Sequence, residues 1–139
     1  MTRTLSAAVA VLASALFGAC LFVAPGHAAG EQTVTPVRAE KLPNVPGKTI
    51  TAVVVNYAPG GKSVSHRHAG SVLAYVLSGT IRSENSATGP AKVYKAGESF
   101  FEPAGSEHLV SENASTTEAA SLLAVFVADD GAQLTTFGK

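Results

Sequence analysis

Short runs of alternating or continuous hydrophobic residues, separated by turn signals, recur along the chain from residue 49 onward. The first run, 50–57, is rich in β-branched residues and ends at Pro59-Gly60-Gly61, which predicts a strand followed by a turn. The nearly continuous apolar run 121–127 is typical of a buried strand. Further strands are predicted at 64–68, 72–77, 80–83, 92–95, 99–102 and 108–111. Because no helical period occurs outside the N-terminal segment, the pattern predicts an all-β barrel or sandwich.

The first 29 residues have the composition of a secretory signal peptide. An almost wholly apolar run over 5–24 follows one positive charge, and small residues surround Ala28 and Ala29. Cleavage there predicts an exported protein, periplasmic or extracellular, without a stable membrane association. An uncleaved segment of about 20 apolar residues would be a membrane anchor instead. Phe17-Gly18-Ala19-Cys20 also resembles a lipoprotein cleavage box, so lipid anchoring through Cys20 is an alternative, although a Phe holds the usual place of Leu.

The region between this leader and the first strand, residues 30–48, is polar and contains Pro36, Pro43 and Pro46. Such a composition predicts an extended N-terminal arm or linker. The remaining residues, 49–139, suit a single domain with one core. The tail of that domain, from residue 129 onward, is expected to form a short cover or edge segment.

Removal of the leader would change the composition of the exported chain. Cys20 is the only cysteine, so the exported chain can form neither a disulfide nor a thiolate nucleophile. Without Arg3, nine basic residues face ten acidic ones, a net charge of −1. This balance and the absence of a basic patch argue against nucleic-acid binding. His27 would also be removed, which leaves three histidines.

Two of these histidines, His66 and His68, lie two residues apart in a predicted strand. Successive side chains of a strand point to opposite faces, so both imidazoles project from one face, about 6.6 Å apart along the backbone, and can bind one ion. A lone buried histidine is more often a hydrogen-bonded core residue than a ligand. With His108 as a candidate third ligand, however, the constellation favours a metal site.

These histidines lie in two motifs whose spacing resembles that of the cupins, small double-stranded β-helix barrels with a jelly-roll topology. The first motif is Gly60, five residues, His66-x-His68, three residues, Val72, six residues and Gly79. The second is Gly97, five residues, Pro103-x-Gly105, two residues and His108. The resemblance implies a cupin barrel over residues 49–139, and it implies a homodimer, since several cupins pair their subunits through an N-terminal arm.

Two motif positions depart from the cupin pattern. The usual glutamate of the first motif falls on Val72, and the asparagine that usually ends the second falls on Glu112. The resemblance therefore implies a site of three histidines with an open position, similar to the iron sites of thiol dioxygenases and diketone-cleaving dioxygenases. Imidazole ligands suit zinc, copper, iron and nickel, and enzymes of the family most often use iron or manganese. The expected cofactor is a divalent ion, Fe, Mn, Zn, Cu or Ni.

Three neutral imidazoles leave the full charge on the ion, which favours a Lewis-acid or oxygen-activating role. The hypothesis is a metal-dependent small-molecule enzyme, dioxygenase-like first and an isomerase or lyase second. The alternative is a non-catalytic cupin that binds a small ligand such as a sugar. No Ser-His-Asp arrangement or phosphate-binding loop offers a competing chemistry, and the sequence assigns no catalytic residue.

The surroundings of the histidines are predicted to be largely apolar, although core packing explains such residues equally well. Candidates to line the site are Val64, Val72, Phe100, Phe101, Val110 and Phe126, with Tyr57 and Tyr75 as polar groups. Glu112 shares the face of His108 if the strand continues, but its turn-rich surroundings favour a solvated loop. Glu98 and Glu102 flank Phe100 and are expected mainly as surface charges.

Overall fold

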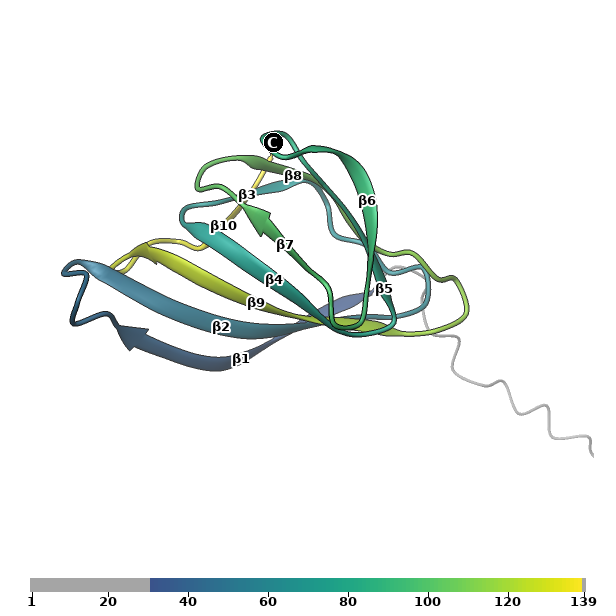
Figure 1. Cartoon of the computed structure of the whole chain (residues 1–139), viewed down its shortest axis with the longest axis horizontal. Coiled ribbons are helices and arrows are strands. Elements are labelled where there is room, and N and C mark those ends of the chain that lie inside the picture. Colours follow the sequence, from purple (N-terminus) through teal and green to yellow (C-terminus); the bar gives the residue numbers. More distant parts are fainter. Residues whose placement is uncertain (1–30, 139) are drawn as a thin grey trace, which may run out of the picture.

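The computed structural model describes residues 31–138. This part of the chain contains ten β-strands and no helix (Figure 1). The predicted all-β class is therefore confirmed. The predicted signal peptide and the lipoprotein box lie outside the described residues, so export and lipid anchoring stay predictions. Within residues 31–138, no helix is long and apolar enough to cross a membrane.

Two five-stranded antiparallel sheets build the barrel. The first sheet has the order β1 (Gln32–Lys41), β2 (Lys48–Tyr57), β9 (Ala120–Asp129), β4 (Ser71–Ser78) and β7 (Ser99–Glu102). The second has the order β10 (Thr135–Phe137), β3 (His66–His68), β8 (Glu107–Asn113), β5 (Thr80–Asn85) and β6 (Gly89–Lys95). The chain passes repeatedly from one sheet to the other, as in a jelly roll (Figure 1). Residues of both cupin-like motifs meet as a result, since His66 pairs with His108.

The core lies between the sheets and follows the alternation of the strands. On β4, for example, Val72, Ala74 and Val76 are buried while Leu73 and Tyr75 are exposed. Strand β9 alternates in the same way, because successive side chains point to opposite faces. The buried apolar residues of the core are Tyr57, Val72, Ala74, Val76, Ile81, Phe100, Ala120, Leu122, Ala124 and Phe126.

Within the segment 30–48, predicted as an extended arm or linker, residues 32–41 form a regular strand. Strand β1 pairs with β2 along nearly its whole length, from Gln32↔Tyr57 to Lys41↔Thr49. Its single register irregularity lies between Pro36 and Arg38. A proline can occupy an edge strand or a bulge because it has no N–H to donate to the ladder. Pro36 is therefore compatible with β1, although prolines in the sequence argued against a strand here.

The outer face of the first sheet carries exposed apolar side chains on three neighbouring strands. Leu73 on β4 lies directly opposite Phe101 on β7, so these side chains share one face. The exposed apolar residues of this face, called here the outer apolar face, are Leu73, Tyr75, Leu77, Phe101 and Val127.

Candidate metal centre

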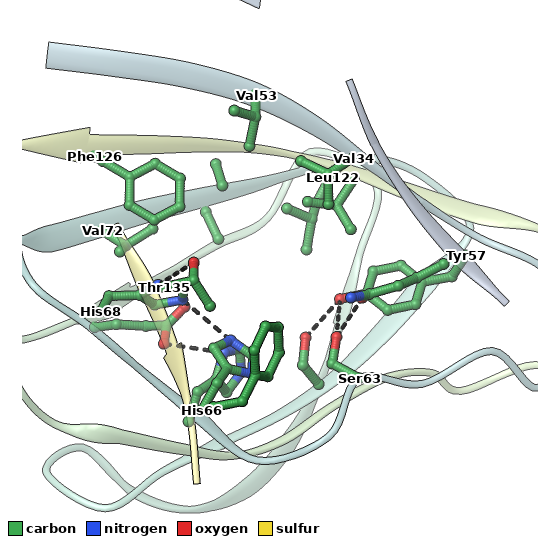
Figure 2. A pocket seen from close by; sticks show the side chains of 18 residues that line it. Val34, Val53, Tyr57, Ser63, His66, His68, Val72, Leu122, Phe126 and Thr135 are labelled. Atoms are coloured by element: carbon green, nitrogen blue, oxygen red, sulfur yellow. Dashed lines mark hydrogen bonds and ion pairs between the residues drawn. The ribbon is translucent and has the colours of Figure 1, made fainter. Parts of the chain in front are cut away.

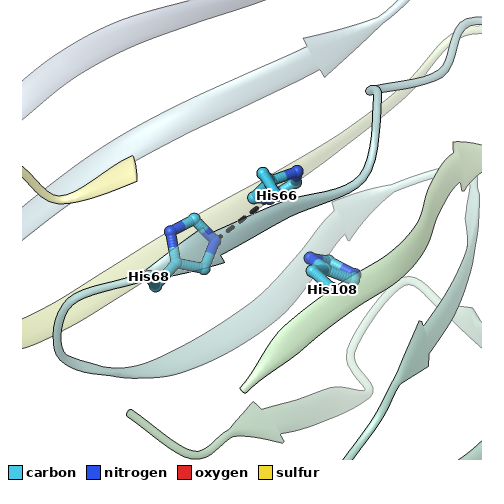
Figure 3. A group of neighbouring side chains, drawn as sticks. All are labelled: His66, His68 and His108. Carbon is cyan, nitrogen blue, oxygen red and sulfur yellow. Dashed lines mark hydrogen bonds between the residues drawn. The ribbon is translucent and has the colours of Figure 1, made fainter. Parts of the chain in front are cut away.

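The three histidines that the sequence singled out meet on the inner face of the second sheet (Figure 3). His66 and His68 lie on β3, and His66 is directly opposite His108 on the neighbouring strand β8. One ring nitrogen from each of the three lies within 4.8 Å of the others. Their exposed fractions are only 7%, 8% and 4%. This arrangement has the ligand type of a single metal site, and the ring nitrogens lie close to the separation that one ion requires.

The hydrogen bonds of His66 and His68 fix the tautomers of both rings. Nδ1 of His66 lies 2.7 Å from the carbonyl oxygen of Val64, and Nδ1 of His68 lies 3.0 Å from that of Leu134. A carbonyl only accepts, so each Nδ1 carries the hydrogen and each neutral ring presents a lone pair on Nε2. The outer hydrogen bonds thus orient both rings as the partners of metal-binding histidines usually do.

The two Nε2 atoms, which face one another, are only 3.1 Å apart. Two lone pairs at this distance need a proton or a cation between them. Burial lowers the pKa of His66 and of His68, which disfavours the proton. Two ligands about 2.1 Å from one ion and at right angles to each other would lie about 3.0 Å apart. The contact between His66 and His68 therefore fits two ligands of one metal ion.

His108 makes two contacts of different kinds. Its Nε2 lies 2.9 Å from the hydroxyl oxygen of Ser83, a buried residue on β5. Its Nδ1 lies 3.0 Å from Oε2 of Glu102, but the ring N–H is not aligned to form a hydrogen bond with that oxygen. Nδ1 of His108 is therefore a buried nitrogen without a well-formed hydrogen bond, beside a carboxylate and close to two other imidazoles.

Glu102, which was expected mainly as a surface charge, is buried in the site with an exposed fraction of 3%. That expectation was wrong because β7 alternates with Phe100 and Glu102 inward and Ser99 and Phe101 outward. Glu98, by contrast, lies in the turn before β7 and is exposed, as expected. The sequence did contain a signal for Glu102. If Phe100 packs inward, the alternation of the strand also places Glu102, two residues later, inward.

Opposing effects act on the carboxyl group of Glu102. Burial raises its pKa, while His108 and then His68 and His66 lower it, and the net effect is a pKa below the usual range. The group is therefore a carboxylate at neutral pH. A buried carboxylate is unfavourable unless a partner compensates its charge, and among residues 31–138 the nearest candidate partner is the imidazole of His108, which carries a charge only when protonated.

The histidines and Glu102 line a cavity of about 210 Å³ between the sheets (Figure 2). Most of its wall is apolar and comes from the first sheet. The apolar lining residues are Val34, Val53, Val55, Val72, Ala74, Leu122, Ala124 and Phe126, with Phe137 from β10. A cavity of this size and lining suits a small molecule with an apolar part.

A second polar group lines the cavity around the hydroxyl of Tyr57, away from His68 in the view of Figure 2. This hydroxyl lies 2.7 Å from the hydroxyl of Ser111 and 3.4 Å from that of Ser63, which also contacts the side-chain carbonyl of Gln32. Burial raises the pKa of Tyr57, so the phenol stays neutral and can exchange hydrogen bonds with a ligand.

Of the other residues predicted to line the site, some line the cavity, one lies in the core and the rest lie outside the lining. Val72 and Phe126 line the cavity, whereas Phe100 belongs to the core and packs with its ring centroid 6.0 Å from that of His108. Tyr75 is 44% exposed on the outer face, because it is one place out of phase with the buried positions of β4. The expectation that Tyr75 lines the site is therefore wrong. Val64 and Phe101 are also exposed, and Val110 is half-buried outside the cavity lining.

Glu112 does not supply the missing carboxylate. It lies on β8, as the first alternative required, but its Oε1 accepts a hydrogen bond from Nη1 of Arg82 at 2.8 Å on the exposed side of the sheet. The irregular pairing of β8 with β5 reverses the expected alternation between His108 and Glu112. The next residue, Asn113, is buried instead and bonds to the backbone around Ala58 and Glu118.

Two antiparallel sheets that form a barrel, with three histidines clustered on the inner wall, are the features of a cupin. Residues 53–126, just over half of the chain, match the cupin domain family. The chain belongs to this family. The search of curated proteins finds no match.

Solved structures with the same fold include proteins of very different length. An uncharacterized conserved protein with a double-stranded β-helix domain from Klebsiella pneumoniae is 23% identical over 91% of this chain and 99% of its own, with a TM-score of 0.61. The DMSP lyase DddQ from Ruegeria pomeroyi is 18% identical over 63% of this chain, with a TM-score of 0.54. Oxalate decarboxylase from Bacillus subtilis, which has Mn(II) centres, is 25% identical over 63% of this chain, with a TM-score of 0.53. The chain spans only 42% of that lyase and 23% of that decarboxylase.

Proposed function

We propose that this protein is a metal-dependent enzyme that acts on a small molecule, with one divalent ion held by His66, His68 and His108. The observation that carries the proposal is the pair of Nε2 lone pairs 3.1 Å apart at the wall of a largely apolar cavity. Among the candidate reactions, oxygen-dependent oxidation comes first and lyase or isomerase chemistry second.

The cavity supports a small-molecule enzyme through its two polar regions and the apolar wall between them. The bound ion would act as a Lewis acid or activate oxygen. The carbonyl groups of Val64 and Leu134 hold the ring orientations of His66 and His68, so the ligands need little rearrangement. Tyr57 and Ser111 would bind a polar group of the substrate, while Val72 and Phe126 exclude water near the ion.

The structural neighbours support metal-dependent chemistry of small molecules without selecting one reaction. They include a DMSP lyase, an oxalate oxidase crystallised with glycolate and a manganese-containing oxalate decarboxylase. The Mn(II) centres of the decarboxylase favour manganese among the five candidate ions, Fe, Mn, Zn, Cu and Ni. The alternative function is a cupin that binds a small ligand without turnover, which the same cavity would also permit.

The test begins with the metal content of the purified protein and continues with turnover. We expect about one equivalent of a divalent metal and substrate-dependent oxygen uptake with at least one member of a panel of thiols, diketones and phenols. His66→Ala, treated with the same metal, is the control and should show neither. Turnover that persists without oxygen would assign lyase or isomerase chemistry. Ligand binding without turnover would establish the binding module, and a protein that binds none of the five metals would overturn the proposal.

We further propose that a second copy of the chain covers the outer apolar face. The five side chains of this face are uncharged, and the exposed Asp129, two residues beyond Val127 on β9, is paired with Lys48, so the face can meet its own copy across a two-fold axis without strong like-charge repulsion. Leu73→Lys would place two equal charges near each other and should shift the protein from dimer to monomer in sedimentation equilibrium. Val93→Lys, an equally exposed valine on β6, is the control and should leave the dimer intact. A monomeric wild type would contradict the proposal.

A further inference from the structure

The carboxylate that the cupin pattern places at position 72 has a counterpart on the neighbouring strand. Val72 on β4 and Glu102 on β7 are direct partners in the antiparallel pairing of these strands. Directly opposite residues of such a pair point to the same face, with Cβ atoms about 5 Å apart. Glu102 therefore enters the cavity beside Val72, in the region that a glutamate at position 72 would occupy.

The contacts of Glu102 differ from those of a carboxylate with a structural role. No Lys or Arg pairs with it among residues 31–138, and its other side-chain contact, to Nδ2 of Asn85, is long at 3.4 Å. Its Oε2 is directed at Nδ1 of His108, 3.0 Å away. The carboxyl group of Glu102 is therefore buried with no permanent cation beside it.

The contact between His108 and Glu102 repeats the geometry of the contact between His66 and His68. If Nε2 of His108 donates its hydrogen to Ser83, Nδ1 presents a lone pair toward Glu102 at 3.0 Å. The absence of an aligned N–H bond between these atoms agrees with this tautomer. Two pairs of electron-rich atoms, at 3.0 and 3.1 Å, then line the same cavity, and one cation can satisfy both.

We propose that Glu102 is the anionic fourth ligand of the metal, so that the carboxylate of the site has moved from β4 to the opposite position on β7. This inference rests on the proposed three-histidine metal site. In the structure Glu102 approaches the histidine group through His108, and rotation about its side-chain bonds would bring the carboxylate onto the bound ion. The centre would then carry three neutral ligands and one anionic ligand.

The proposal makes an exchange of residues the decisive experiment. Zinc affinity is measured by competition with a chromophoric chelator, and cobalt(II) absorption reports the coordination. Glu102→Gln, which keeps the size and an acceptor oxygen but removes the charge, should weaken zinc binding by at least about 100-fold and change the cobalt spectrum, because the loss of an outer-shell partner alone typically costs 10- to 100-fold. The exchange variant Val72→Glu/Glu102→Val should recover most of the affinity, because it returns a carboxylate to the same cavity.

Two controls accompany this test, and its outcomes separate the inference from the underlying site. Circular dichroism verifies that each variant is folded, and Glu98→Gln removes an exposed carboxylate near β7 that has no contact with the histidines. Wild-type affinity and an unchanged cobalt spectrum in Glu102→Gln would overturn the role of Glu102, while the three-histidine site would stand. A weakened Glu102→Gln that the exchange does not rescue would also overturn it, and would make Glu102 a residue that positions His108. A wild type that binds none of the five candidate metals would overturn the site itself.

Discussion

Replacement of His66 by alanine is expected to abolish stoichiometric metal binding and the stabilisation that the metal provides. An ion that binds the folded state stabilises it by about 2.7 kcal/mol at a free concentration one hundred times its Kd. For a domain of this size that corresponds to a rise in Tm of roughly 10 °C. The wild type should show this rise on metal addition, and the variant should show almost none.

The physical reason lies in the small number of ligands. With His66 removed, His68 and His108 remain on strands β3 and β8, and the pair of Nε2 atoms 3.1 Å apart is lost. The measurement is a thermal melt with and without added metal, together with the metal content after desalting. Leu109→Ala, half-exposed and adjacent to His108, is a control for changes on β8 and should keep the full metal-dependent shift. An equal shift in His66→Ala would contradict the prediction.

The parts of the fold that could be predicted are those that depend on local pattern. The run 99–102 was predicted with the bounds that β7 has, and 121–127 lies within β9. The two-residue spacing of His66 and His68 fixes their common face in any strand. Their meeting with His108 depends on pairing between β3 and β8, and only the resemblance to a known motif could supply that long-range register.

The parts that were missed depend on strand register or on tertiary contacts. Local sequence does not show that Glu102 pairs with Val72, since 29 residues separate them along the chain and the register comes from the folded sheet. In the arm, the pairing of β1 with β2 overrides the turn signal of Pro36, whereas Pro43 and Pro46 lie in the turn between these strands. Strand β5 extends to Asn85 and β6 begins at Gly89, so both are longer than the predicted runs 80–83 and 92–95, and only a short turn separates them.

Val72→Glu is expected to destabilise the metal-free protein and to reduce turnover of the metal-loaded protein. The new carboxylate would lie directly opposite Glu102 in a buried cavity. Like charges in direct opposition repel each other, and an uncompensated buried charge typically costs about 3 kcal/mol or more. The free energy of unfolding without metal should therefore fall by about 3 kcal/mol, measured by urea denaturation in the presence of a chelator.

Metal should reverse most of this loss, because a divalent ion neutralises both carboxylates at once. Binding should then be as tight as in the wild type or tighter, while the second carboxylate occupies a position and cancels charge that the substrate requires. Val72→Gln is the matched control, since it adds similar volume and no charge. It should show neither the metal-reversible loss of stability nor tighter metal binding. Turnover that rises together with metal affinity in Val72→Glu would show that the open position is dispensable, and that the valine at position 72 is a lost ligand rather than part of the working site.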